Sequence, residues 1–216
     1  MPYHPPVSKP VLIFGGSFDP PTIAHRVQPS RVAEMIDADR VIYVPAAISP
    51  HKLDVPPLDP AHRLAMLELA IDGLCDVEIS TIELDRKGPS YMIDTLRSFR
   101  GRMDDDRPLR LLIGDDQAMA FHRWKDWREI IELAEPIIMP RLHADPASMA
   151  AALSAEGQWS DEEIRRWIEW RIDLPIMDVE ATIIRERIAR DEPVDDLLAS
   201  DVFDYIGSNR LYSKTG

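Results

Sequence analysis

Short apolar segments alternate with helix-like segments along this chain of 216 residues, and the alternation limits the fold more than any other feature. The apolar segments with the length of buried strands are residues 11–14, 41–44, 77–84, 109–113, 137–139 and 174–179. Alternation at this spacing predicts an α/β fold, an open, mostly parallel sheet with helices on both faces. In such folds ligands bind at the carboxyl ends of the strands, so the loops after the strands are the places to search for a site.

The helix-like segments carry start and stop signals. Asp59 is suited to an N-cap, Pro60 to the first helical position, and Gly73 to the place where the chain leaves the helix. Segments 91–100 and 127–134 follow later strands and are also predicted to be helical.

The connection over residues 141–175 is long enough to hold one or two helices. Ser160 and Glu163 have the spacing of a capping box, which predicts a helix start there. Trp167 and Trp170 then lie on one helical face, where we expect them to pack against the protein or a partner rather than bind a cofactor.

Composition excludes several functional classes. The longest apolar runs are too short for a membrane span, and residues 1–10 lack the apolar core of a secretory signal, so we expect a cytoplasmic protein. The net charge of -13 disfavours nucleic acid and anionic membranes as partners. A nucleotide enzyme with this surface needs a local positive pocket and a divalent cation. The single cysteine, Cys75, excludes an intramolecular disulfide and is expected to be buried.

The residues after segment 11–14 have the composition of a phosphate-binding turn. Glycines at this place let the backbone approach a phosphate, because they have no Cβ. Thr22 and His25 are three residues apart, so at a helix start both can face one anion beside the backbone N–H groups. The run reads Gly15-Gly16-Ser17-Phe18-Asp19-Pro20-Pro21-Thr22-Ile23-Ala24-His25.

This run resembles the signature of the HxGH/TxGH nucleotidyltransferase superfamily, in which Gly-x-Phe-Asp-Pro is followed by His or Thr, two residues, and His. Further short segments occur in the order found in bacterial nicotinate mononucleotide adenylyltransferases. They are Pro50-His51-Lys52, Arg63-Leu64-Ala65-Met66-Leu67, Gly88-Pro89-Ser90-Tyr91, Asp94-Thr95-Leu96, Gly114-Asp115-Asp116, Trp124, Trp127-Arg128, Pro140-Arg141, Tyr205-Ile206 and Leu211-Tyr212.

The resemblance implies a Rossmann-like nucleotidyltransferase fold and a reaction of NAD biosynthesis. ATP and nicotinate mononucleotide would give deamido-NAD and pyrophosphate, with Mg²⁺ as cofactor. The sequence does not identify the residues that bind the Mg²⁺. The attacking phosphate is already an anion, so such an enzyme needs no general base and no covalent intermediate. It must align the attacking phosphate with the α-phosphorus and stabilise the leaving pyrophosphate.

The resemblance also implies roles for individual residues. The catalytic contacts with the phosphates would come from Thr22, His25, Lys52 and Arg185. ATP would be bound by Gly15, Gly16, Ser17, Phe18, Gly114, Asp116 and Thr182. The pyridine mononucleotide would be bound by Ser90, Tyr91 and Trp124. Residues 1–216 would form one domain, with 1–10 as a polar extension and 176–216 as a C-terminal helical part that completes the ATP site.

The chain departs from the family pattern at several positions. Ala24 replaces the usual glycine before the histidine, and Pro29 falls where a helix interior is expected, so we expect that helix to start late or to kink. Met92 replaces a threonine associated with the nicotinate carboxylate. Glu180 and Ala181 replace serines in the family's C-terminal phosphate-binding segment.

These departures leave alternatives open. The acceptor could instead be nicotinamide mononucleotide, whereas phosphopantetheine fits less well because its enzymes are shorter and lack the later motifs. A nucleotide-binding protein without turnover is a further alternative, favoured by the altered segment around Glu180 and disfavoured by the retained Thr22, His25 and Lys52. The sequence does not determine the oligomeric state, and a homo-oligomer is one of the possible states.

Overall fold

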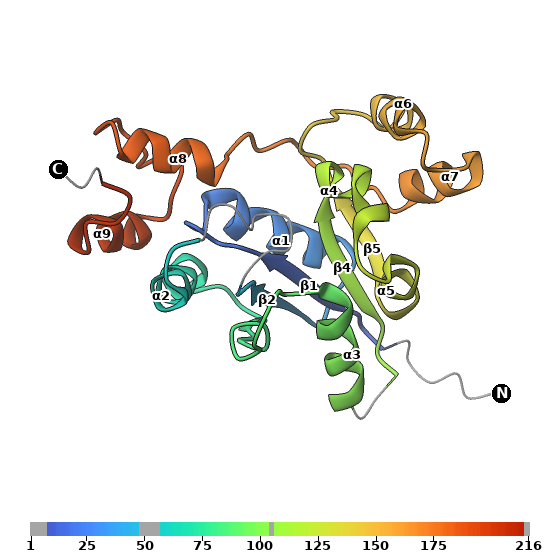
Figure 1. Cartoon of the computed structure of the whole chain (residues 1–216), viewed down its shortest axis with the longest axis horizontal. Coiled ribbons are helices and arrows are strands. Elements are labelled where there is room, and N and C mark those ends of the chain that lie inside the picture. The colour runs from blue at the N-terminus through green and yellow to red at the C-terminus, as the bar shows by residue number, and fades with distance from the viewer. Residues whose placement is uncertain (1–7, 48–56, 104–105, 214–216) are drawn as a thin grey trace.

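One parallel sheet forms the centre of the computed structural model, which describes residues 8–47, 57–103 and 106–213. Within these residues the sheet has five strands in the order β3-β2-β1-β4-β5, and every neighbouring pair is parallel (Figure 1). The strands are β1 (Val11–Gly16), β2 (Arg40–Pro45), β3 (Val77–Ile79), β4 (Leu109–Gly114) and β5 (Glu135–Met139). The predicted fold class is confirmed, and β1 is the central strand, with Gly15 and Gly16 at its carboxyl end.

Helices cover both faces of the sheet (Figure 1). They are α1 (Ile23–Met35), α2 (Pro60–Ile71), α3 (Met92–Arg102), α4 (Asp115–Met119), the 3₁₀ turn η1 (Phe121–Arg123), α5 (Trp127–Leu133), α6 (Pro146–Glu156), α7 (Asp161–Glu169), α8 (Ala181–Ile188) and α9 (Ser200–Ser208). Alternate β1 residues face opposite ways: Ile13 packs in the layer of α3, α5, α6 and α7, and Leu12 in the layer of α1, α2, α8 and α9. The sheet is therefore buried on both faces, as its apolar strands require.

The helix signals are confirmed by the structure. The Asp59 side chain accepts a hydrogen bond from the Ala61 N–H at 2.8 Å and Pro60 begins α2. The long connection holds α6 and α7, with the expected capping box at the start of α7. Trp167 is 1% exposed and packs edge-to-face on Trp170, so this pair is part of the core.

Two predicted strands are wrong in extent or in kind. Only Val77–Ile79 of segment 77–84 pairs with β2; the chain then turns, and Ile82 and Glu83 are buried beside α3 rather than continuing an edge strand. Segment 174–179 is not a strand, because Pro175 has no N–H to give to a ladder. Arg171 makes only an isolated bridge to Ile138, and the chain then crosses to the pocket, where Met177 and Val179 lie.

Two local expectations also need correction. Of the two outcomes expected from Pro29, the late start is wrong, since α1 begins directly after Thr22 and includes Pro29 in its interior; the kink stays a prediction. Cys75 is exposed rather than buried, because it lies in the turn between α2 and β3 and not in either element. Among the described residues, each helix is too short or too polar to cross a lipid bilayer.

Candidate active site

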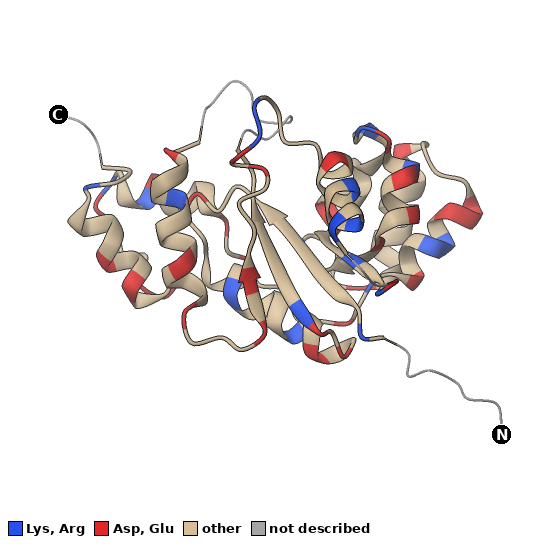
Figure 2. Ribbon diagram, turned by 90° about the horizontal axis from the view of Figure 1, so that it is seen from below, with Lys and Arg blue, Asp and Glu red and all other residues tan. Residues whose placement is uncertain are grey.

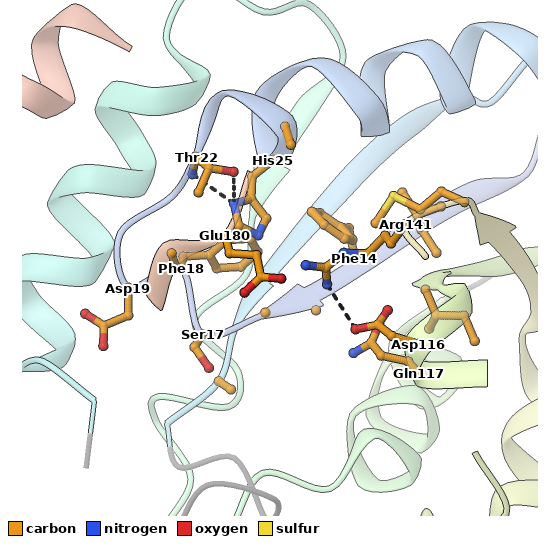
Figure 3. A pocket seen from close by; sticks show the side chains of 18 of the residues that line it. Phe14, Ser17, Phe18, Asp19, Thr22, His25, Asp116, Gln117, Arg141 and Glu180 are labelled. Carbon is orange, nitrogen blue, oxygen red and sulfur yellow. Dashed lines mark hydrogen bonds and ion pairs between the residues drawn. The ribbon is translucent and has the colours of Figure 1, made fainter. Parts of the chain in front are cut away.

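A cleft of about 1220 Å³ opens at the carboxyl ends of the strands. It lies next to the ends of the neighbouring strands β1 and β4. Its walls come from the loop after β1, the starts of α1, α3 and α8, and the loops after β4 and β5 (Figure 3). The sequence-predicted residues that line it are Gly15, Gly16, Ser17, Phe18, Thr22, His25, Ser90, Tyr91, Asp116, Trp124, Thr182 and Arg185. Gly114 lies just behind Asp116, and Lys52 lies outside the described residues.

Thr22 and His25 are joined at the start of α1. The Thr22 N–H donates to His25 Nδ1 at 2.8 Å, and the Thr22 hydroxyl lies 2.9 Å from the same nitrogen. A backbone N–H can only donate, so Nδ1 is the acceptor and the proton of the neutral ring is on Nε2. Nε2 lies on the ring edge away from Thr22, toward the cleft (Figure 3). The pair thus presents an N–H donor to an anion in the cleft.

Phe18 shapes the loop between β1 and α1. Its φ of 48° is in the left-handed region, which is uncommon for a residue with a side chain and is often found at functional sites. The ring is 2% exposed and packs edge-to-face on His25, with centroids 5.3 Å apart, and on Phe14 at 5.8 Å. Packing of the ring therefore holds the loop in this conformation and supports the His25 imidazole.

Asp19 anchors the same loop to distant parts of the chain. The Tyr212 hydroxyl donates to Asp19 Oδ1 at 2.6 Å, and the Leu58 N–H donates to Oδ2 at 3.3 Å. Burial and, to a lesser extent, the hydrogen bond to Asp19 raise the pKa of Tyr212. The hydroxyl therefore stays protonated and can donate this bond. The C-terminal end of the chain and the entry to α2 are therefore both fixed to the glycine-rich loop.

Arg63 is a buried cation beneath the cleft. It is fully buried, and its guanidinium donates to the carbonyl oxygens of Ser17 at 2.7 Å, Leu58 at 2.9 Å and Ala47 at 3.3 Å. Burial lowers the pKa of Arg63, and the nearby Asp19 carboxylate opposes this shift. Arg63 thus ties the loops after β1 and β2 to α2.

The start of α8 forms the next wall of the cleft. Glu180 is the N-cap and α8 begins at Ala181, so Thr182 lies in the first turn of this helix. Arg185 lies one turn in; its Nη1 donates to the Asp19 carbonyl at 2.7 Å and its Nη2 to Thr182 Oγ1 at 3.2 Å. The Glu180 carboxylate extends into the part of the cleft that holds His25 (Figure 3).

The loops after β4 and β5 meet at Gly114. A Cβ at Gly114 would come within 2.2 Å of Asp116 Oδ1 and 2.6 Å of Arg141 Cδ, so a larger residue would displace these two side chains. Arg141 and Asp116 form an ion pair at 3.2 Å. The fully buried Asp115 carboxylate accepts from the Leu142 N–H at 3.0 Å and so fixes the loop that carries Arg141.

The start of α3 closes the opposite end of the cleft. Ser90 Oγ accepts a hydrogen bond from the Ala47 N–H at 3.0 Å, and the Thr95 hydroxyl donates to Glu83 Oε1 at 2.7 Å. Burial raises the pKa of Glu83, against the opposing effects of its hydrogen bonds with Thr95 and Ser90. This network fixes the segment that presents Ser90 to the cleft.

Aromatic rings lie near the same end of the cleft. Trp124 stacks on Phe121 with ring centroids 4.7 Å apart and also lines the cleft. The Lys125 ammonium lies 4.8 Å from the centre of the Tyr91 ring. A flat ring and a nearby cation suit a ligand with an aromatic ring and an anionic group.

Charge in the cleft differs from charge on the outer surface. Acidic residues are spread along the outer helices (Figure 2), in keeping with the net charge of -13. The cations among the described cleft residues are Arg123, Lys125, Arg141 and Arg185, and the carboxylates are Asp19, Glu83, Asp116 and Glu180. Of these carboxylates, Asp19, Glu83 and Asp116 have the partners described above, whereas the Glu180 carboxylate makes no hydrogen bond or ion pair with another described residue.

Comparisons with known proteins agree with this geometry. The cytidylyltransferase-like family model matches residues 13–187. A probable nicotinate-nucleotide adenylyltransferase from Chromobacterium violaceum is 35% identical over 209 residues, which cover 94% of this chain and 98% of that protein. One from Albidiferax ferrireducens is 35% identical over 205 residues, with the same coverage.

The chain belongs to the nicotinate-nucleotide adenylyltransferase family. Solved structures share the fold: Plasmodium falciparum nicotinic acid mononucleotide adenylyltransferase complexed with NaAD has a TM-score of 0.74 and 18% identity, covering 94% of this chain and 97% of that one. The same enzyme complexed with APC has a TM-score of 0.71. The predicted family, the Rossmann-like fold and the nucleotidyltransferase class are therefore confirmed.

Several residues that shape this family member's cleft were not selected from the sequence. Glu83 lies two residues from the exposed Asp85, and Asp115 lies beside the partly exposed Asp116, so nothing in the local pattern marks either residue as buried. Arg63 does carry a signal, because it occupies an inward position of the amphipathic α2 among apolar residues. An arginine there needs buried acceptors, and the loop carbonyls supply them.

Proposed function

We propose that this nucleotidyltransferase joins the AMP of ATP to nicotinate mononucleotide, giving deamido-NAD and pyrophosphate. One observation carries the assignment: the Thr22–His25 pair and Arg185 face the same cleft that Ser90 and Trp124 line at its other end. A phosphate-binding end and an aromatic-binding end in one cleft fit a reaction between a nucleotide and a pyridine mononucleotide.

In this proposal the Nε2–H of His25 and the Arg185 guanidinium contact the phosphates of ATP. The phosphate of the acceptor attacks the α-phosphorus, the bond to the β-phosphate oxygen breaks, and pyrophosphate leaves with the electron pair. Donors fixed in advance stabilise the charge that develops, which is the main electrostatic contribution expected of such a site. Lys52, which the resemblance places near the phosphates, would add positive charge.

The adenosine and acceptor ends follow from the remaining walls. Asp116 and Gly114 would contact the adenosine, since the ion pair with Arg141 fixes the Asp116 carboxylate there. Ser90, Tyr91 and Trp124 would hold the pyridine mononucleotide, with the ring near Trp124. Met92 lies at the start of α3 where the family threonine would stand, so nicotinamide mononucleotide is the alternative acceptor.

A magnesium ion fits the donors of this cleft. No cluster of three or more His, Cys, Asp or Glu side chains exists among the described residues, so the phosphates of ATP would supply most oxygen ligands. Proteins commonly hold Mg²⁺ with one or two carboxylates plus substrate phosphates, and Glu180 is positioned to give one. The ion would offset phosphate charge, while Glu180 would place it near His25.

Purified protein with ATP, Mg²⁺ and one acceptor at a time tests the proposal through pyrophosphate release. We expect release with nicotinate mononucleotide and much less with phosphopantetheine. Preference for nicotinamide mononucleotide would select the alternative acceptor. ATP binding without release with any acceptor would show a nucleotide-binding protein without turnover.

A further inference from the structure

Pro29 removes a hydrogen bond from α1 directly below the phosphate-binding histidine. A proline has no N–H, so the usual helical bond from residue 29 to the His25 carbonyl cannot form, and the ring crowds that carbonyl, which destabilises an ordinary helix. Nevertheless α1 continues from Ile23 to Met35. Another group must therefore stabilise this carbonyl.

The Tyr43 hydroxyl supplies that group. It donates to the His25 carbonyl oxygen at 3.0 Å, although Tyr43 belongs to β2. Tyr43 is fully buried, and burial raises the pKa of its hydroxyl, so the hydroxyl remains a protonated donor.

Ring packing links the same tyrosine to the His25 side chain. Tyr43 pairs with Phe14 across the sheet and packs edge-to-face on it, with centroids 5.8 Å apart, and lies 6.0 Å from Phe18. Phe14 and Phe18 in turn contact the His25 imidazole at 5.9 Å and 5.3 Å. The tyrosine thus holds His25 both at its backbone and through two neighbouring rings.

We propose that Tyr43 is a positioning residue for catalysis: its hydroxyl replaces the helical hydrogen bond that Pro29 removes and keeps His25 Nε2 directed at the phosphates. The inference rests on the role proposed above for His25. Tyr43 itself is absent from the described cleft lining, so it acts through His25.

A double-mutant cycle on the full chain tests the proposal, because Pro29→Ala restores the missing N–H. We expect Tyr43→Phe to lower kcat about ten-fold with little change in the KM for either substrate. Pro29→Ala alone should be nearly silent, and adding it to Tyr43→Phe should return kcat to within about two-fold of the wild type. Tyr205→Phe is the matched control, since its hydroxyl bonds His62 between α9 and α2, and it should leave kcat unchanged.

Nitrogen NMR of the His25 ring gives a readout that does not depend on turnover. We expect the wild type and the double variant to show the proton on Nε2, and Tyr43→Phe to show a mixture of tautomers. Unchanged kcat and ring signals in Tyr43→Phe, or a double variant no better than Tyr43→Phe, would overturn the proposal. If Tyr43→Phe does not fold, the double variant decides: equal activity to Pro29→Ala supports the proposal, and a loss of kcat overturns it. A silent His25→Ala would instead refute the proposed role of His25, whatever the ring signals show.

Discussion

The Arg185 guanidinium donates to the Asp19 carbonyl oxygen at 2.7 Å, across 166 positions of sequence. This bond joins α8 to the loop after β1, so the two segments proposed to bind ATP phosphates form one surface. Arg185 is fixed by its second bond to Thr182 as well. The cation is therefore oriented before any ligand arrives, which reduces the entropy lost on binding.

Replacing Arg185 tests whether charge or geometry matters at α8. We expect Arg185→Ala to lower kcat/KM for ATP by about 10- to 100-fold, the range of a lost charge-assisted hydrogen bond. Arg185→Lys should recover only part of this, because an ammonium cannot reproduce the two-bond geometry of the guanidinium. Steady-state kinetics with Arg187→Ala as the control measures both, and equal rates for all variants would exclude α8 from the phosphate site.

The role of His25 predicts a large effect on rate in a variant that still folds. We expect His25→Ala to slow pyrophosphate release by about two to three orders of magnitude, the typical cost of one preorganised donor to a transition-state anion. The variant should still fold, with a melting temperature lowered by the lost bond to the Thr22 N–H and the lost packing on Phe18. His62→Ala, which alters a histidine at the α2–α9 contact, is the control and should keep full activity.

Glu180 is predicted to help hold the magnesium that accompanies ATP. Glu180→Ser should raise the Mg²⁺ concentration needed for half-maximal rate several-fold, because one carboxylate ligand is lost. Titration of Mg²⁺ at saturating ATP measures this value. Tighter ATP binding with an unchanged Mg²⁺ requirement would show instead that the carboxylate only repels the phosphates.

Met92 is predicted to weaken discrimination between acceptors. The ratio compared is kcat/KM with nicotinate mononucleotide divided by kcat/KM with nicotinamide mononucleotide. Met92→Thr should raise this ratio about ten-fold, because the new hydroxyl could form one hydrogen bond with the charged carboxylate of nicotinate. Met92→Leu removes the sulfur but adds no hydroxyl and should leave the ratio unchanged. A ratio that is the same in all three proteins would show that this position does not contact the pyridine substituent.

Glu83 is predicted to make stability depend on pH. Burial raises its pKa above the ordinary 4.5, so the folded state holds this proton more tightly than the unfolded state. Its contribution to stability is complete below pH 4.5 and is lost as pH rises through the raised pKa. We therefore expect Glu83→Gln to melt higher than the wild type at neutral pH and to match it in acid.

Melting curves over a pH series check this prediction. Glu129→Gln is a control of opposite sign, because the bond with Arg97 lowers the pKa of Glu129. The stability that this pair contributes is present above the ordinary pKa and is lost as pH falls through the lowered one. A Glu83→Gln protein that melts below the wild type at neutral pH would contradict the expected sign.

Local patterns in the sequence were sufficient for the parallel sheet, the start of α2 and the glycine-rich loop of the cleft, whereas the other predicted cleft residues came from the family resemblance. Apolar segments such as 11–14 indicate burial on both faces of the sheet. Thr22 and His25 lie three residues apart, so their joint position at a helix start follows from short-range geometry. Segment 174–179 has the apolar composition of a strand, but Pro175 and the path of the chain from Arg171 to the cleft keep it out of the sheet.

Only the tertiary structure decided which distant groups complete these local features. The bonds from Tyr43 to His25, from Tyr212 to Asp19 and from Arg185 to Asp19 join residues far apart in the chain. Nothing in the residues near Pro29 shows that a hydroxyl from β2 replaces the hydrogen bond to the His25 carbonyl that Pro29 cannot form. A buried carbonyl must be satisfied by some donor, but the sequence does not specify which one, because that depends on how the layers pack.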